Sequence, residues 1–416
     1  MDCILTGVAS LREGPLTEAA LVEHVFPLFS RVLRRDAHEL YLSNHSLGRP
    51  PDRMAEDVAS AVGAWYSGMD GAWGPWFDEL TGFRCKTAQL TGAPRPDCIV
   101  PKSSAGQGLR AVLNSFPEPP RVLTTTAEFD SIELILHQYA ARGRAVVEQV
   151  APRADGQLHT EDLIARLRGM DLVVVSHVFF ATGQVLSGLA ELIHAAHAAG
   201  AKVLLDCYHS YGALPLDLSG LGADFAVGGS YKYLRGGPGC SWLYVHPRWL
   251  DRGLSTLDVG WFAKKEPFGY ERAMTPELAA GGDGWLESTF APLPLFQARA
   301  GLDFVLAMGV ERLRTYSLTQ KQLLSGLLAE RGIAHFGAGA EHGAFVTIPH
   351  PDPMRLAERM KRAGVNADAR HAGLRLCPDV LTTEGQLAEA VERLTRALMP
   401  PVRQAPPHSS NAAICS

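Results

Sequence analysis

The chain has 416 residues, of which 46% are hydrophobic and 20% are charged, and its formal net charge is -5. This composition is that of an ordinary globular protein, and the length suits a large domain plus a smaller one. The slightly acidic charge gives no electrostatic reason to expect nucleic acid or an anionic membrane as a partner, and no apolar run is long enough to span a bilayer.

The cysteines and histidines do not suggest a metal site. Seven cysteines are scattered along the sequence without a C-x-x-C pair, a pattern that suits reduced thiols in the cytosol. His194 and His197 are spaced to share a helix face, but no carboxylate or thiol accompanies them, so we predict no metal. Asp2 and Glu13 interrupt the apolar residues at the start, so we expect no signal peptide and a cytoplasmic protein.

Most of the sequence alternates between strand and helix patterns. Helical periodicity over residues 15–40 and 51–66 leads to a Gly- and Trp-rich run, S-G-M-D-G-A-W-G-P-W. The strands expected after it are 98–100, 121–125, 145–150, 171–176, 202–206, 224–228 and 241–245, and the helices between them are 109–116, 130–142, 160–168 and 189–199. This alternation predicts an α/β fold with a large, mostly parallel sheet that is covered by helices on both faces.

The pattern changes after about residue 290. A long helix over 293–329 should break near Gly309, and strand 344–348, helix 353–363, strand 373–376 and helix 383–398 follow. Thr383 and Gln386 fit a capping box at the start of the last helix. We predict a large domain over 61–290 and a smaller α+β domain over 291–399. Residues 1–60 should belong to the small domain or a dimer contact, and the Pro/Ser-rich tail 400–416 should be disordered.

One stretch carries most of the chemical information. A short apolar strand, 203–205, is followed at once by Asp206 and then by His209. Lys232 lies between two tyrosines and ahead of a glycine-rich run, R-G-G-P-G. A lysine that can form a Schiff base and an acid that can pair with a pyridinium nitrogen are the two protein groups that pyridoxal phosphate requires. The residues therefore point to a pyridoxal-phosphate enzyme that acts on an amino acid.

The same stretch resembles a known family. S-H-V-F-F-A-T-G-Q, L-L-D-C-Y-H-S-Y-G and G-G-S-Y-K-Y-L-R-G-G-P-G closely resemble kynureninase, in the class V branch of the fold type I pyridoxal-phosphate enzymes. The likeness covers roughly residues 38–396 and is sharpest between 176 and 239. It implies that Lys232, Asp206 and Tyr231 are catalytic, and that Asp206, His209, Tyr231 and Lys232 contact the cofactor.

Further roles follow from the resemblance one residue at a time. Ser103 and Ser104, in S-S-A-G-Q-G ahead of a helix, match the phosphate-binding turn, and a helix N-terminus independently favours a phosphate dianion. Arg375 matches the arginine that holds the substrate carboxylate, a task that suits a planar guanidinium. Phe129 matches the aromatic residue that stacks on the cofactor ring. Ser176, Trp261 and Thr289 match residues that contact the cofactor, and the resemblance implies that Trp261 does so from the neighbouring subunit. His45 matches a residue on the substrate side.

The chain also departs from the family pattern. His45 stands where the family has an asparagine, and Ile132 stands where it has an acid close to the reacting centre. Ser288 and Thr289 occupy the place of an asparagine, and a Gly-His pair of the substrate pocket is replaced around Ala72 and Trp73. The residues that match the cofactor-binding part of the family pattern are thus kept, while those that would contact an aryl ketone substrate differ.

The resemblance implies a homodimer with its active site at the subunit interface. It implies that the amino acid, held as a Schiff base with the cofactor, undergoes hydrolytic Cβ–Cγ cleavage, as for kynurenine or another γ-keto amino acid. Because the substrate pocket differs, transamination, β-elimination with C–S cleavage, or decarboxylation of another amino acid stays open. A non-catalytic binding subunit is a further alternative, against which the intact lysine, aspartate and phosphate turn argue.

Overall fold

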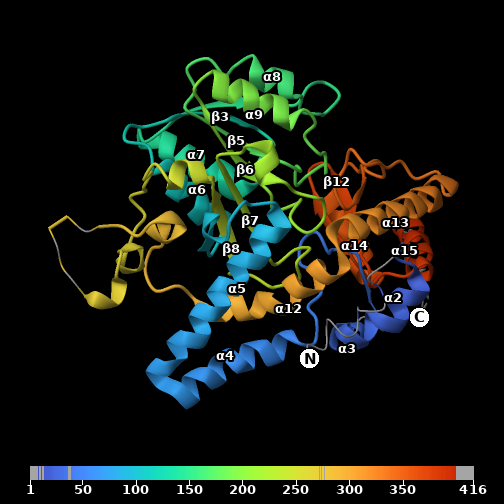
Figure 1. The fold of residues 1–416 in the computed structure, drawn as a ribbon. Helices are drawn as coiled ribbons and strands as arrows, with labels where there is room; N and C mark the ends of the chain where they lie inside the picture. The colour runs from blue at the N-terminus through green and yellow to red at the C-terminus, as the bar shows by residue number, and fades with distance from the viewer. Residues whose placement is uncertain are drawn as a thin grey trace, which may run out of the picture.

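A large α/β region and a smaller α+β region lie side by side in the protein (Figure 1). The computed structural model describes residues 14–35 and 39–399 apart from 271, 273 and 276, together with residues 8 and 11. The tail 400–416, for which we predicted disorder, lies outside these described residues, and so does part of the predicted segment 1–60.

A seven-stranded sheet forms the centre of the large region. Its order is β2-β8-β7-β6-β5-β3-β4, in which β8 runs antiparallel to both neighbours and all other pairs are parallel. Every residue of β5 is buried, as expected where helices cover both faces of a sheet. The strands are β2 (Ile99–Lys102), β3 (Arg121–Thr125), β4 (Val146–Val150), β5 (Leu172–Ser176), β6 (Lys202–Asp206), β7 (Phe225–Gly229) and β8 (Ser241–Val245).

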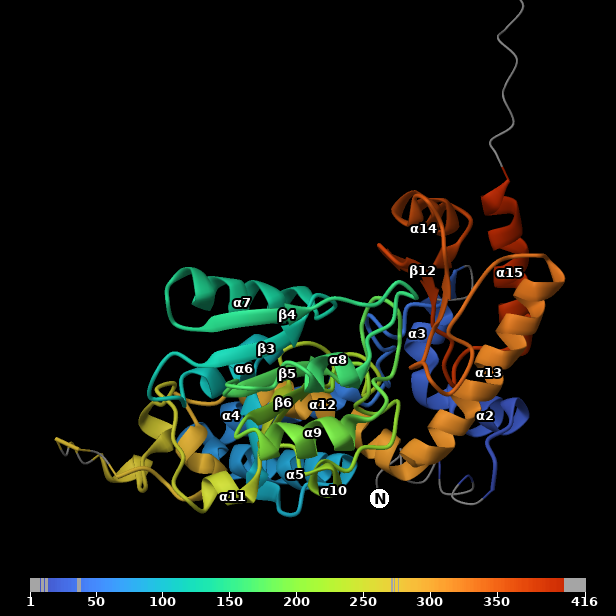
Figure 2. The same cartoon turned by 90° about the horizontal axis from the view of Figure 1, so that it is seen from above.

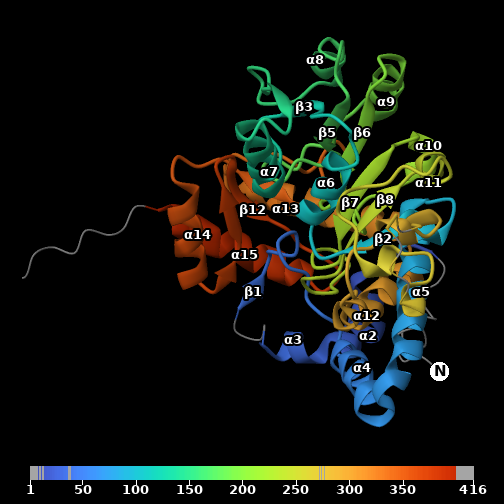
Figure 3. The same ribbon diagram turned by 90° about the vertical axis from the view of Figure 1, so that its left-hand side faces the viewer.

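Helices lie on both sides of this sheet, which confirms the α/β prediction (Figure 3). On one side are α6 (Ala105–Leu113) and α7 (Asp130–Ala141), and on the other are α9 (Leu189–Ala198) and α10 (Leu218–Leu221). Two short helices, α8 (Thr160–Ile164) and α11 (Pro247–Leu250), complete this region. At the β2 edge, α5 (Trp73–Thr91) packs on β2, and α4 (Met54–Gly68) packs on α12 (Pro292–Met308).

The smaller region begins where the chain bends sharply. Helices α12 and α13 (Val310–Glu330) meet at 82° at Gly309, whose φ of 80° suits glycine. Beyond them lies an antiparallel sheet of order β11-β12-β9, and α14 (Pro353–Arg362) packs on β11 and β12 (Figure 2). Its elements are β9 (Val346–Ile348), α14 (Pro353–Arg362), β10 (Val365–Asn366), β11 (Asp368–Arg370), β12 (Gly373–Leu376) and α15 (Glu384–Leu398).

The N-terminal segment reaches this smaller region. After α2 (Glu18–His24) and α3 (Ser30–Arg35), the short strand β1 (Leu40–Tyr41) pairs in parallel with β10, and Leu40 faces Val365. This pairing supports our proposal that the N-terminal segment belongs to the small domain. No single helix among the described residues is long and apolar enough to cross a membrane, and α12 with α13 meets that length and composition only as a bent pair.

Several element boundaries differ from the sequence prediction. The helix expected over 15–40 is divided into short pieces around a 3-10 turn that contains Pro27. The helix expected over 109–116 begins at Ala105, because the Ser104 side chain accepts a hydrogen bond from the Gln107 amide at 3.2 Å and so caps it. Helix α5 was not predicted. The break at Gly309 and the capping box of Thr383 and Gln386 are confirmed.

Candidate active site

A cavity of about 340 Å³ lies at the carboxyl ends of β5 and β6. In open α/β sheets this edge is where ligands bind, because the loops that leave parallel strands converge there. The cavity brings together eight of the residues predicted from the sequence: Ser103, Ser104, Phe129, Ser176, Asp206, His209, Tyr231 and Lys232.

Lys232 follows β7 and its side chain is buried, with 6% of the residue exposed. Its Nζ lies 2.5 Å from His209 Nε2 and 5.8 Å from the centre of the Phe129 ring. Burial disfavours the charged form and lowers the pKa of Lys232 to about 7, although the nearby carboxylate of Asp206 acts in the opposite direction. A large share of this amine is therefore neutral at neutral pH, as a nucleophile or a base requires.

The N-terminal segment fixes the backbone of Lys232. The Gly48 amide donates to the Tyr231 carbonyl at 2.8 Å, and a Cβ at Gly48 would lie 2.0 Å from the Lys232 carbonyl oxygen. Only glycine permits this approach. Three residues after the lysine, Arg235 has a φ of 58° and donates to Asp379 at 2.7 Å. The position of the lysine thus depends on contacts with both ends of the chain.

Asp206 ends β6 and is buried in the same cavity. Its Oδ1 accepts the Tyr208 amide at 2.9 Å, and its partner across β5 and β6 is Ser176. Burial raises the pKa of Asp206, while the Tyr208 hydrogen bond and the charge of Lys232 oppose that rise. A cationic ring nitrogen placed beside it would hold this carboxylate in its ionised form.

The other end of the cavity suits an anion. Ser103 and Ser104 precede α6, so the helix dipole and its first amides point toward this end. Arg110, one to two turns along α6, also lines the cavity, and sequence reasoning missed it. A hydroxyl pair, a helix N-terminus and a guanidinium at one end, with a carboxylate and an amine in the same cavity, fit the phosphate, ring nitrogen and aldehyde of pyridoxal phosphate.

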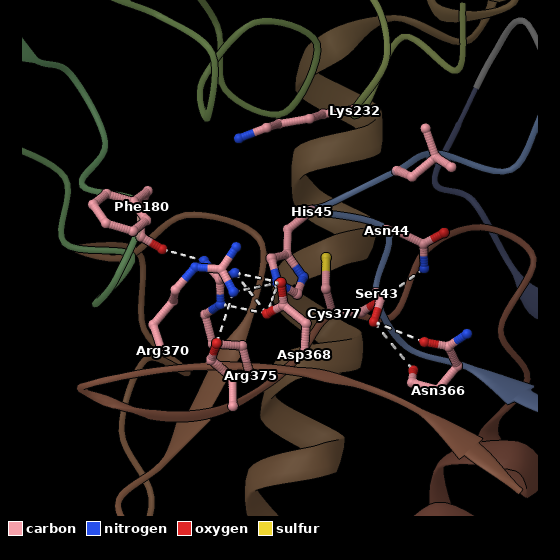
Figure 4. Close-up of polar contacts among 12 residues, drawn as sticks. Ser43, Asn44, His45, Phe180, Lys232, Asn366, Asp368, Arg370, Arg375 and Cys377 are labelled. Atoms are coloured by element: carbon pink, nitrogen blue, oxygen red, sulfur yellow. Dashed lines mark hydrogen bonds and ion pairs between the residues drawn. The ribbon is translucent and has the colours of Figure 1, made fainter. Parts of the chain in front are cut away.

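Arg375, predicted to bind the substrate carboxylate, is engaged by a protein carboxylate (Figure 4). Its Nε and Nη2 donate to the two oxygens of Asp368 at 2.7 and 2.6 Å, and its Nη1 donates to the Phe180 carbonyl. Phe180 lines the cavity, so the guanidinium lies at the cavity's edge. Arg370 lies 3.4 Å from Asp368, and we call His45, Asp368, Arg370 and Arg375 the Asp368 cluster.

His45, the other predicted substrate-side residue, belongs to this cluster. Its Nε2 lies 2.9 Å from Asp368 Oδ1, while its buried Nδ1 has no hydrogen-bond partner within the described part of the chain. Burial, with help from the charge of Arg375, lowers the pKa of His45 to about 4. The ring is therefore neutral at pH 7, and the hydrogen on Nε2 donates to the carboxylate. His45 thus supports Asp368 directly and can affect a substrate through it.

Two predicted cofactor residues, Trp261 and Thr289, lie apart from the others. Trp261 Nε1 donates to Thr289 Oγ1 at 3.2 Å, and neither residue lines the Lys232 cavity of this chain. Thr289 lines a separate hollow of about 180 Å³, which shares Ser103 and Gly239 with the main cavity. The structure therefore does not bring these two residues to Lys232 within one subunit.

Among the polar residues around the site that sequence reasoning missed are Arg110, Glu128, Tyr208 and Asp368. Tyr208 lines the cavity, and its hydroxyl lies 2.6 Å from Ser241 Oγ. Glu128 directly precedes Phe129, which we predicted to stack on the cofactor ring, so its place in the sequence could have indicated that it lies near the site. Nothing in the sequence alone shows that Asp368 pairs with Arg375, because that pairing depends on the antiparallel register of β11 and β12.

The chain is similar to known proteins over most of its length. The model of the aminotransferase class-V family matches residues 58–351. A kynureninase of Geobacillus thermodenitrificans is 29% identical over 389 residues, covering 87% of this chain and 89% of that protein. A kynureninase of Deinococcus radiodurans is 30% identical over 363 residues, covering 82% and 84%. A kynureninase of Pseudomonas fluorescens is 28% identical, covering 80% and 82%.

Solved structures with the same fold include a C-S lyase and a cysteine desulfurase. The cystine C-S lyase C-DES, in complex with cysteine persulfide, superimposes with a TM-score of 0.77 at 22% identity, covering 87% of this chain and 98% of that one. A cysteine desulfurase of Thermococcus onnurineus gives 0.76 at 18% identity, covering 89% and 96%. At these identities the likeness establishes the fold, which is that of the fold type I pyridoxal-phosphate enzymes.

Proposed function

The chain belongs to the aminotransferase class-V family and is a kynureninase-like enzyme that depends on pyridoxal phosphate, and we propose that it hydrolyses the Cβ–Cγ bond of a γ-keto amino acid. The observation that carries this proposal is the shared cavity of Lys232 and Asp206, in a chain similar to kynureninases over most of its length. L-kynurenine and 3-hydroxykynurenine are the substrates to test first.

We assign a proposed role to each group of residues that lines the cavity. When bound, the cofactor supplies an electrophilic aldehyde and an electron-poor ring that stabilises negative charge at the substrate α-carbon. Asp206 would hold the proton of the ring nitrogen, and Phe129 would cover a face of the ring. Lys232, neutral in a large share of molecules at neutral pH, would accept the α-proton at Nζ. Ser103, Ser104 and Arg110 would hold the phosphate.

Arg375 keeps donors for a substrate carboxylate even while it is bound to Asp368. A guanidinium has five N–H groups, and Asp368 and Phe180 accept three of them, one each from Nε, Nη1 and Nη2. The two remaining N–H groups lie one on each terminal nitrogen. A carboxylate could be bound by this pair, while Asp368 orients the guanidinium from its other side.

The function is tested by offering the purified holoenzyme L-kynurenine and 3-hydroxykynurenine. We expect release of anthranilate or its 3-hydroxy derivative together with one alanine per turnover, followed by product fluorescence and amino-acid analysis. Lys232→Ala, which removes the proposed base, should lower kcat by about a thousandfold or more. Turnover of another amino acid by transamination, β-elimination or decarboxylation, with no cleavage of either kynurenine, would contradict the proposed reaction.

The proposed role of Arg375 predicts a selective defect. Arg375→Gln should lower kcat/KM by roughly a hundredfold, mainly through KM, because a charge-assisted pair with the substrate carboxylate is lost. Arg370→Gln is the matched control in the same cluster, because Arg370 is more exposed and lies farther from Asp368, and its effect should be several times smaller. An Arg375→Gln variant that binds substrate normally but loses cofactor affinity would show a structural role instead.

We also propose that the enzyme is a cytoplasmic homodimer in which Trp261 and Thr289 serve the partner's cavity. Both residues lie outside the Lys232 cavity of their own chain, beside the hollow that adjoins the phosphate end. Large apolar side chains are exposed around them, among them Leu257, Phe268 and Tyr270, which supports a covered surface. The free thiols of the described cysteines support a reducing compartment.

Complementation between two inactive variants tests the shared site. Lys232→Ala and Trp261→Ala subunits, mixed after unfolding and refolding together, should form hybrids in which one of the two sites has neither defect. We expect roughly a quarter of the wild-type activity per subunit if pairing is random. Each variant refolded alone is the control. A mixture that is no more active than the sum of these controls would show that Trp261 serves its own chain.

A further inference from the structure

Glu128 is a buried acid that the proposed reaction does not use. It lies in the loop between β3 and α7, with 3% of the residue exposed. The Thr125 hydroxyl lies 2.8 Å from its Oε1, and the Ser176 hydroxyl lies 2.5 Å from its Oε2. Among the residues that the structure describes, no lysine, arginine or histidine forms an ion pair with this carboxyl.

The surroundings of Glu128 favour its neutral form. Thr125 of β3 and Ser176 of β5 offer hydroxyls, and the charged neighbour that acts on it is the carboxylate of Asp206 in β6. Burial raises the pKa of Glu128 to about 7, although hydrogen bonds from Ser176 and Thr125 oppose the rise, and the charge of Asp206 adds to it. Since Asp206 is the acid that a cationic ring nitrogen would keep ionised, the two carboxyls are driven to opposite protonation states.

The protonation state of Glu128 decides what Ser176 can offer to the cavity. A serine hydroxyl has one hydrogen to donate and two lone pairs. Beside an ionised Glu128, the Ser176 hydrogen is committed to that carboxylate, and only lone pairs face the cavity. Beside a protonated Glu128, the carboxyl can donate to the Ser176 oxygen, and the serine hydrogen is then free to point into the cavity that Ser176 lines.

We propose that Glu128 is a positioning residue that carries a proton and thereby turns the Ser176 hydroxyl into a hydrogen-bond donor toward the bound cofactor. The inference rests on the proposed function for the identity of that ligand.

The protonation of Glu128 can be measured without any ligand. The infrared spectrum of the cofactor-free, full-length protein minus that of Glu128→Gln should show the C=O stretch of a neutral carboxylic acid at pH 6. That band should fade as the pH is raised through about 7. A difference spectrum that shows only ionised carboxylate at pH 6 would overturn the proposal, whatever reaction the enzyme catalyses.

Cofactor affinity tests whether that proton acts through Ser176. We would measure the dissociation constant of pyridoxal phosphate for the wild type and for Glu128→Gln at pH 6 and pH 8. The ratio of the wild-type constant to the variant constant should rise by about tenfold from pH 6 to pH 8, because the wild type loses one donor to the cofactor. The titration of the cofactor and of Lys232 changes both constants equally, so it does not change their ratio. In the Ser176→Ala background, the same Glu128→Gln comparison should give a ratio that does not change with pH.

These outcomes separate this inference from the proposed function. A pH-independent ratio in the Ser176-containing pair, or a pH-dependent ratio that persists in the Ser176→Ala pair, would overturn the role of Glu128 while leaving cofactor binding intact. Failure of every variant and of the wild type to bind pyridoxal phosphate would instead contradict the cofactor assignment. The infrared result would still report the state of Glu128.

Discussion

The removal of Lys232 and Asp206 from water into one cavity is the constraint on which the site depends. Burial of an isolated charge costs several kcal/mol even after the protein relaxes, so each group shifts toward its neutral form unless the other group or a ligand compensates. Burial lowers the pKa of Lys232 and raises that of Asp206, as that cost requires. A cofactor with an aldehyde and a basic ring nitrogen would offset this cost for both groups, because the aldehyde reacts with the amine and the protonated ring nitrogen pairs with the carboxylate.

The smaller region is joined by main-chain contacts to the loop that follows β5 in the large region. The Gly343 amide donates to the Gly183 carbonyl at 2.7 Å, and the Val185 amide donates to the Glu341 carbonyl at 2.9 Å. Lys321 supports the 337–343 loop from α13, where its buried Nζ lies within hydrogen-bond distance of the carbonyls of Gly337, Gly339, His342 and Gly343. Because Arg375 of β12 also donates to Phe180 after β5, its guanidinium is held in place by both regions.

The residues that meet around Lys232 could be predicted from the sequence, and so could Arg375 and His45, but the contacts that join Arg375 and His45 to Asp368 could not. Asp206 and Lys232 each follow a buried apolar strand, and parallel strands bring such positions to one edge of a sheet. The Asp368 cluster depends instead on strand register: Asp368 faces Arg375 across β11 and β12, and His45 comes from the other end of the chain. Helix α5 was missed because its Gly- and Pro-containing start, W-G-P-W, reads locally as a loop.

Reductive trapping tests the central claim most directly. The purified holoenzyme would be treated with borohydride, digested, and its peptides would be mapped by mass spectrometry. The account predicts a phosphopyridoxyl group on the peptide that contains Lys232, in proportion to the loss of the cofactor's absorbance, and on no other lysine. A protein that holds no cofactor, or one labelled on a different lysine, would contradict it.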